Sequence, residues 1–112
     1  MTGETVPAGD RRHRGPVLYA VEIARSVVRD LHGQLIPEAV LAAFERLIDE
    51  DGPLARHPLS GLALTRSLAG KYRWKLGDQQ SPWRVIYLVD EDQWAVQVLA
   101  IGHRSEIYRR HF

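Results

Sequence analysis

The spacing of hydrophobic residues changes twice along this chain, and these changes constrain its fold more than any other feature. Residues 17–22 contain the β-branched and aromatic residues that are typical of a short strand. Over residues 23–48 the hydrophobic residues recur at helical spacing, and from residue 72 onward strand-type segments return. The sequence therefore predicts one strand, then two helices, then three or four antiparallel strands.

The two predicted helices have recognisable ends. The first ends at Gly33, and the second begins at Pro37 and ends at Gly52. Because only residues 34–36 separate them, we expect an antiparallel helix hairpin. Residues 52–61 predict a loop, since two prolines lie between its terminal glycines. Residues 62–68 form either one short strand or a continuation of that loop.

Three strand-type segments follow, at residues 72–76, 83–89 and 94–101. The acidic residues 90–92 and Gln93 join the last two segments as an antiparallel hairpin, and a short tail ends the chain. The predicted fold class is α+β: an N-terminal strand, an antiparallel helix hairpin, and a three- to four-stranded antiparallel sheet.

Bulk properties restrict the class of protein. A chain of 112 residues is sufficient for one domain. We expect residues 1–15 to form a flexible basic arm and residues 16–112 to form the domain. The chain has no cysteine, and its longest apolar stretch near the N-terminus is too short to span a membrane. We therefore expect a cytoplasmic protein. With a net charge of +1, any polyanion site must be a local concentration of cations.

One such concentration lies in residues 71–76. The strand period of two places Tyr72 and Trp74 on one face and Arg73 and Lys75 on the other. If the helices cover one face, the aromatic residues belong to the core and the two cations point outward together. Taken alone, the pair is explained more simply by a solvated strand face.

Two further strands add candidates to this face. Arg84 lies second in its strand between apolar neighbours, so it can join the outward cations. We expect Gly102 to release the last strand and to bring His103 and Arg104 around its end, with Tyr108 nearby. The result is a predicted site that holds cations and aromatic residues and has no carboxylate at its centre.

This composition indicates a phosphate-bearing ligand, because arginine pairs well with phosphate oxygens. No clustered carboxylates or paired histidines suggest a metal site, so no metal and no other cofactor is expected. RNA supplies its own nucleophile, the 2′-hydroxyl, and its cleavage needs charge stabilisation and proton transfer. Arg73 and Arg84 suit the first task. Lys75, His103 and Tyr108 are candidates for the second.

With these residues in view, the chain resembles the RelE/ParE toxin superfamily. The similar segments are residues 68–78, residues 83–87 and, most specifically, the Gly-His-Arg-Ser-Glu-Ile-Tyr sequence within residues 101–108. The resemblance implies a ribosome-dependent mRNA endonuclease that is held inactive by a cognate antitoxin protein. Its expected partners are therefore the antitoxin, the ribosome and mRNA, with no membrane.

The resemblance also implies site residues. Family catalytic positions fall on Arg73, Lys75, Arg84, Arg104 and Tyr108. Combining them with residue chemistry, we predict two groups. The catalytic residues are Lys75, Arg84, His103, Arg104 and Tyr108. The RNA- or phosphate-binding residues are Lys71 and Arg73.

Two other functions share this fold. One is a ParE-like inhibitor that binds DNA gyrase without nuclease activity, and the other is an inactive binding module. Neither requires the joint presence of the cations and Tyr108, so the sequence favours the nuclease.

Overall fold

A computed structural model describes residues 17–64 and 70–111. The predicted arm, residues 1–15, and most of the segment 62–68 therefore lie outside the described residues. The elements follow in the order β1 (Ala20–Ile23), α2 (Arg25–His32), α3 (Glu38–Ile48), α4 (Pro53–Arg56), a 3₁₀ turn (Pro58–Ser60), β2 (Leu62–Ala63), β3 (Lys71–Lys75), β4 (Trp83–Asp90), β5 (Ala95–His103) and α5 (Ile107–His111). None of the described helices has the length and apolar character needed to cross a membrane.

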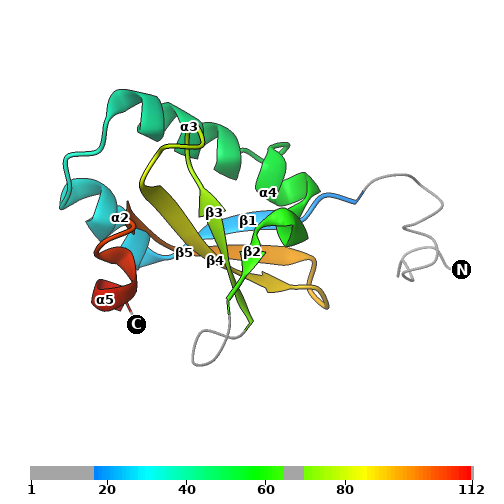
Figure 1. Ribbon diagram of the computed structural model, residues 1–112. Helices are drawn as coiled ribbons and strands as arrows, with labels where there is room; N and C mark the ends of the chain where they lie inside the picture. Colours follow the sequence, from blue (N-terminus) through cyan, green and yellow to red (C-terminus); the bar gives the residue numbers. More distant parts are fainter. Residues whose placement is uncertain (1–16, 65–69, 112) are drawn as a thin grey trace, which may run out of the picture.

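The strands form one five-stranded sheet in the order β1-β5-β4-β3-β2 (Figure 1). β2 to β5 are antiparallel neighbours, as predicted, and the residue 90–93 hairpin joins β4 to β5. The N-terminal strand completes the sheet by pairing parallel to β5. Parallel pairing needs a long crossover, and the helices between β1 and the later strands supply it. The predicted α+β fold is confirmed.

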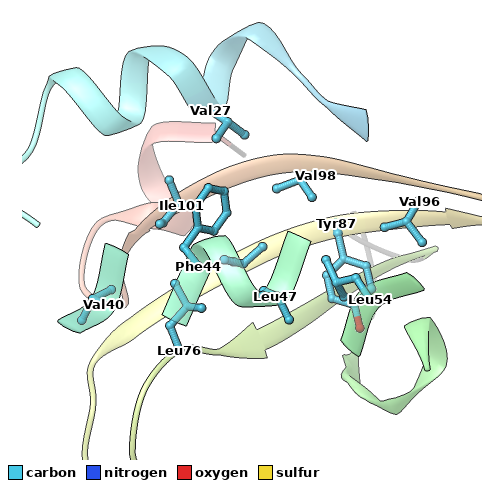
Figure 2. Packing of buried hydrophobic residues seen from close by; sticks show 11 residues of the cluster. Val27, Val40, Phe44, Leu47, Leu54, Leu76, Tyr87, Val96, Val98 and Ile101 are labelled. Carbon is cyan, nitrogen blue, oxygen red and sulfur yellow. The ribbon is translucent and has the colours of Figure 1, made fainter. Parts of the chain in front are cut away.

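The two predicted helices cover one face of this sheet. α2 packs on β5, and α3 runs back over the sheet in roughly the opposite direction (Figure 1). Figure 2 shows the core between the two layers, where Val27 of α2 lies above Val98, and where Phe44 and Leu47 of α3 belong to the same cluster. Tyr72 and Trp74 pack against the same cluster, which confirms their predicted inward orientation.

Two segments differ from the expected irregular structure. The predicted loop over residues 52–61 contains the helical turn α4, which starts at a proline and buries Leu54 and Ala55. The predicted tail after β5 contains α5, whose Ile107 is 1% exposed against β4 and β5. Both helices are too short to show a helical period in the sequence, and packing against the sheet stabilises them.

The acidic hairpin between β4 and β5 has a local structural role. The Asp90 carboxylate accepts hydrogen bonds from the backbone N–H groups of Asp92 and Gln93, at 3.1 and 3.0 Å. Trp94, which follows, has a positive φ of 53° and packs its ring on Tyr19. Asp90 therefore stabilises the turn between β4 and β5, as expected of a solvated hairpin.

Candidate functional site

The pairing of β3 with β4 places three cations on one side of the sheet. Lys75 lies opposite Arg84, and Arg73 lies opposite Ile86. Paired residues in an antiparallel ladder project to the same face. Arg73, Lys75 and Arg84 therefore share the face opposite α2 and α3, as the strand period predicted.

Arg84 is the buried member of this group. Only 5% of its surface is exposed, whereas Lys75 is exposed and Arg73 is half-buried. Its Nη1 donates hydrogen bonds to the carbonyl oxygens of Ser81 (2.7 Å) and Trp83 (3.1 Å). Its buried Nε has no hydrogen-bond partner among the described residues. A buried donor without a partner costs free energy, so an acceptor from a ligand would stabilise this site.

Arg104 and Tyr108 lie within electrostatic range of Arg84. The pKa of Arg84 is lowered by burial first, and then by the positive charges of Arg73 and Arg104. Tyr108 acts on this pKa in the opposite direction. The structure therefore brings Arg73, Arg84, Arg104 and Tyr108 together. Arginine remains charged at neutral pH even with a lowered pKa, so the cluster is strongly positive.

The turn between β3 and β4 links two of these arginines. The carbonyl oxygens of Ser81 and Trp83 accept hydrogen bonds from the Arg84 side chain, and the carbonyl of Pro82, between them, accepts the backbone N–H of Arg104 at 2.8 Å. The backbone carbonyls of this turn are site components that the side-chain pattern did not reveal.

Two expectations about the end of β5 are wrong. Gly102 does not release the strand, because it remains in the ladder opposite Arg84 and β5 continues to His103. The face that carries the arginines is also not fully open, because α5 packs on it. Ile107 of α5 forms a buried cluster with Ile86 and Ala100, and Tyr108 packs against this cluster, so Tyr108 has an apolar support on one side.

His103 is placed differently from the other candidates. It pairs with Trp83, whose side chain belongs to the opposite face, and the two rings lie edge to face with centroids 5.8 Å apart. Its Nδ1 accepts the backbone N–H of Ser105 at 3.1 Å. His103 is therefore directed away from the face that Arg84 occupies. Lys71, by contrast, pairs with Leu88 at the start of β3 and shares the face of Arg73.

A pocket of about 280 Å³ adjoins the cluster. Residues 60–62 and residues 73–75 line it. Gly61 has no space for a side chain, because an added Cβ would lie 2.7 Å from the Arg73 carbonyl and would also overlap the Tyr87 hydroxyl. No local sequence pattern marked residues 60–62 as part of the site, since only the chain's return beside β3 brings them there.

Among the described residues, no carboxylate lies at the centre of the site. Arg84 has no acidic group among the charges that affect its pKa. Arg56 forms an ion pair with Asp51, at 2.6 Å on the surface. No group of three potential His, Cys, Asp or Glu metal ligands occurs in the part of the chain that the structure describes. The arrangement can bind an anion through arginine hydrogen bonds and stabilise negative charge that develops on it.

Comparison with known proteins gives consistent matches. The family model for the ParE toxin of type II toxin–antitoxin systems matches residues 20–108. The chain is 36% identical to toxin RelG of Mycobacterium tuberculosis over 93 residues, which cover 82% of this chain and 98% of that protein. It is 34% identical to toxin RelE of the same organism, with coverage of 81% and 87%.

Solved structures agree with these sequence matches. The toxin–antitoxin complex RelBE2 of Mycobacterium tuberculosis contains a chain that is 32% identical, with a TM-score of 0.62 and coverage of 80% of this chain and 95% of that chain. The isolated RelE toxin of Escherichia coli, at 20% identity, has a TM-score of 0.57 with coverage of 82% and 93%, and shows likeness of fold.

Proposed function

This chain belongs to the RelE/ParE family of type II toxins, and from that premise we propose that it is a metal-independent endoribonuclease that cleaves mRNA on the ribosome. Its toxin domain would span residues 16–112, after the basic arm of residues 1–15. Action on translating ribosomes would place it in the cytoplasm. The family resemblance in the C-terminal segments and the arginine cluster support this proposal.

The single observation that carries it is the state of Arg84. Arg84 is buried, its Nε has no hydrogen-bond partner within residues 17–64 and 70–111, and two further arginines lie nearby, which is electrostatically unfavourable without an anion. A phosphate diester supplies both missing elements, negative charge and acceptor oxygens. Arg84 would therefore contact a non-bridging phosphate oxygen.

The proposed reaction requires no metal. The RNA 2′-oxygen loses its proton and attacks the adjacent phosphorus, and the bond from phosphorus to the 5′-oxygen then breaks as that oxygen gains a proton. The products are a 2′,3′-cyclic phosphate and a 5′-hydroxyl. Arg73, Arg84 and Arg104 would stabilise the negative charge of the pentavalent transition state, because preorganised donors in a partly desolvated site are effective there.

Proton transfer would fall to groups on the same face. Lys75 lies opposite Arg84 and is exposed, and Tyr108 lies within electrostatic range of it. Both are therefore better placed than His103, which lies against Trp83. His103 stays a predicted catalytic residue only if the ribosome or RNA approaches the end of β5 from its side. Lys71 and Arg73 would hold neighbouring phosphates.

We further propose an antitoxin protein as the partner of this toxin. The similar RelBE2 structure is a toxin–antitoxin complex, and the family model describes a toxin of such a system. An acidic antitoxin segment that covered the arginine cluster would block access of RNA.

A second function is inhibition of DNA gyrase without nuclease activity. The matching family model, which is that of the ParE toxin, favours it. Similarity to toxins RelG and RelE favours the nuclease instead. The two functions need different targets, so they can be separated directly.

The deciding experiment is in vitro translation with the purified toxin, followed by primer extension of the mRNA. Cuts that appear within ribosome-bound message only when the toxin is added support the nuclease. Intact message together with inhibition of gyrase supercoiling would instead establish the second function.

A further inference from the structure

Part of the edge of β5 is covered by side chains instead of by a strand. β1 pairs with β5 only as far as Ile23 and Val98, and the Ala24 N–H then donates to the Val98 carbonyl at 2.9 Å. The chain next turns into α2. Beyond this point β5 keeps β4 as a neighbour on one side, and no strand formed by residues 17–64 or 70–111 lies on the other. Its backbone groups on that side lie under α2 and need partners there.

Three side chains from the α2 segment supply those partners. Ser26 Oγ donates to the Leu99 carbonyl. Asp30 Oδ2 accepts the Ile101 N–H at 3.0 Å, and Gln34 Nε2 donates to the Ile101 carbonyl at 3.0 Å. The regular spacing of four residues puts Ser26 and Asp30 on the same side of α2, with Gln34 just beyond its end. Both backbone groups of Ile101 are thereby satisfied.

Asp30 is the least replaceable of the three. Its side chain is 1% exposed, so the Ile101 N–H would have no access to water if the carboxylate were removed. Gln34 reinforces the arrangement, because its amide also donates to the Asp30 carbonyl at 2.9 Å. The segment around Ile101 is therefore held by α2 at two points.

Ile101 connects this arrangement to the arginine cluster. The next residue, Gly102, lies opposite Arg84, and Arg104 follows with its N–H on the Pro82 carbonyl. A shift of Ile101 would move Arg104 relative to Arg84. We propose that Asp30 is a positioning residue: through Ile101 it sets the placement of Arg104 beside Arg84 for the RNA-cleaving function proposed above, on which this inference rests.

Asp30 belongs to α2, and its side chain lies against the backbone of β5 at Ile101, so it would not contact the substrate. Its loss should therefore change the rate of the chemical step more than the binding of RNA. Small displacements of catalytic groups lower rates strongly.

The experiment compares Asp30→Leu, which removes the acceptor, with Asp30→Asn, which keeps a carbonyl oxygen. Val40→Ala, a core substitution under α3, serves as a control with lowered stability. Without substrate, we expect Asp30→Leu to speed hydrogen exchange of the Ile101 amide and to shift the side-chain NMR signals of Arg84 and Arg104. In the cleavage assay, we expect kcat per folded molecule to fall about 10- to 100-fold with KM nearly constant. Asp30→Asn should restore both properties.

Unchanged arginine signals in Asp30→Leu, with kcat per folded molecule equal to that of Val40→Ala, would overturn the inference. If Asp30→Leu does not fold, Gln34→Leu removes the second contact to Ile101 and is judged by the same signals. If the wild-type protein cuts no mRNA, the proposed function fails, and the arginine signals still decide whether Asp30 positions the cluster.

Discussion

Lys75 on β3 lies directly opposite Arg84 on β4, so two positive side chains share one position of the antiparallel ladder. Like charges at such a position destabilise a sheet. Arg73 and Arg104 add further positive charge. Burial is the largest cause of the lowered pKa of Arg84, and these two charges lower that pKa further. This concentration of charge opposes folding, and binding of a polyanion would offset it.

Lys75→Met tests the separation of stability from function. Because the substitution removes a like charge, we expect the free energy of unfolding to stay constant or rise by up to about 0.5 kcal/mol. We expect mRNA cleavage to fall at least about 100-fold if Lys75 transfers a proton. Urea unfolding and primer extension measure the two effects. Full cleavage by a folded Lys75→Met protein would exclude that role.

Arg84→Lys tests whether the guanidinium itself is needed. Lysine keeps the positive charge. It cannot reproduce the guanidinium geometry, in which Nη1 donates to the carbonyls of Ser81 and Trp83 while Nε is left to donate to a ligand. We expect kcat to fall about 100-fold or more and the free energy of unfolding to fall by about 1–3 kcal/mol. Activity is compared per folded molecule, as judged by circular dichroism. Activity close to wild type would show that a positive charge at residue 84 is sufficient for cleavage without the guanidinium group.

Arg104→Ala separates catalysis from folding more cleanly, because this side chain is exposed. We expect growth arrest and mRNA cleavage to be lost while the melting temperature stays nearly constant. Arg29→Ala is the matched control, since Arg29 is an exposed arginine on α2, away from the cluster. Equal losses in both variants would indicate a general effect of charge on RNA binding.

Because Tyr87 is buried, we expect the folded protein to lose stability at alkaline pH. Burial raises the pKa of Tyr87 from 10.0 to about 12, and its hydroxyl donates to the Pro58 carbonyl at 2.7 Å. The folded state favours the protonated form, so its stabilisation is complete below pH 10 and is lost as the pH rises from 10 to about 12. The shift corresponds to roughly 2–3 kcal/mol. Urea unfolding at stepped pH measures this loss, and Tyr87→Phe should show a flatter pH profile.

Gly61→Ala tests the wall of the pocket beside Arg73. The new Cβ would overlap the Tyr87 hydroxyl and lie 2.7 Å from the Arg73 carbonyl. We expect a loss of about 1–3 kcal/mol in the free energy of unfolding, because neighbouring groups must move. In a double-mutant cycle with Tyr87→Phe, which removes the overlapping hydroxyl, the combined loss should be smaller than the sum. Additive losses would show that the hydroxyl is not the obstacle.

Local pattern was sufficient to predict much of this protein. The periodicity located β1, α2, α3 and the three long strands, because one side of each element packs against the core and its spacing shows in the sequence. The strand period also placed Arg73 and Lys75 on one face of β3, and Tyr72 and Trp74 on the other face. Short elements such as α4 and α5 were not predictable, since their stability comes from contacts with the sheet.

The sequence by itself determined the cation and aromatic residues of β3 and β4, and their faces, because alternation in a strand is a local property. Only the tertiary structure decided that Arg84 is buried and that its Nε has no partner in the described part of the chain. It likewise decided that the backbone of Arg104 is hydrogen-bonded to Pro82 and that His103 turns toward Trp83. It also decided that Asp30, far away in the sequence, holds Ile101. These relationships depend on the pairing of β4 with β5 and on the position of α2 over the sheet edge, which no local pattern encodes.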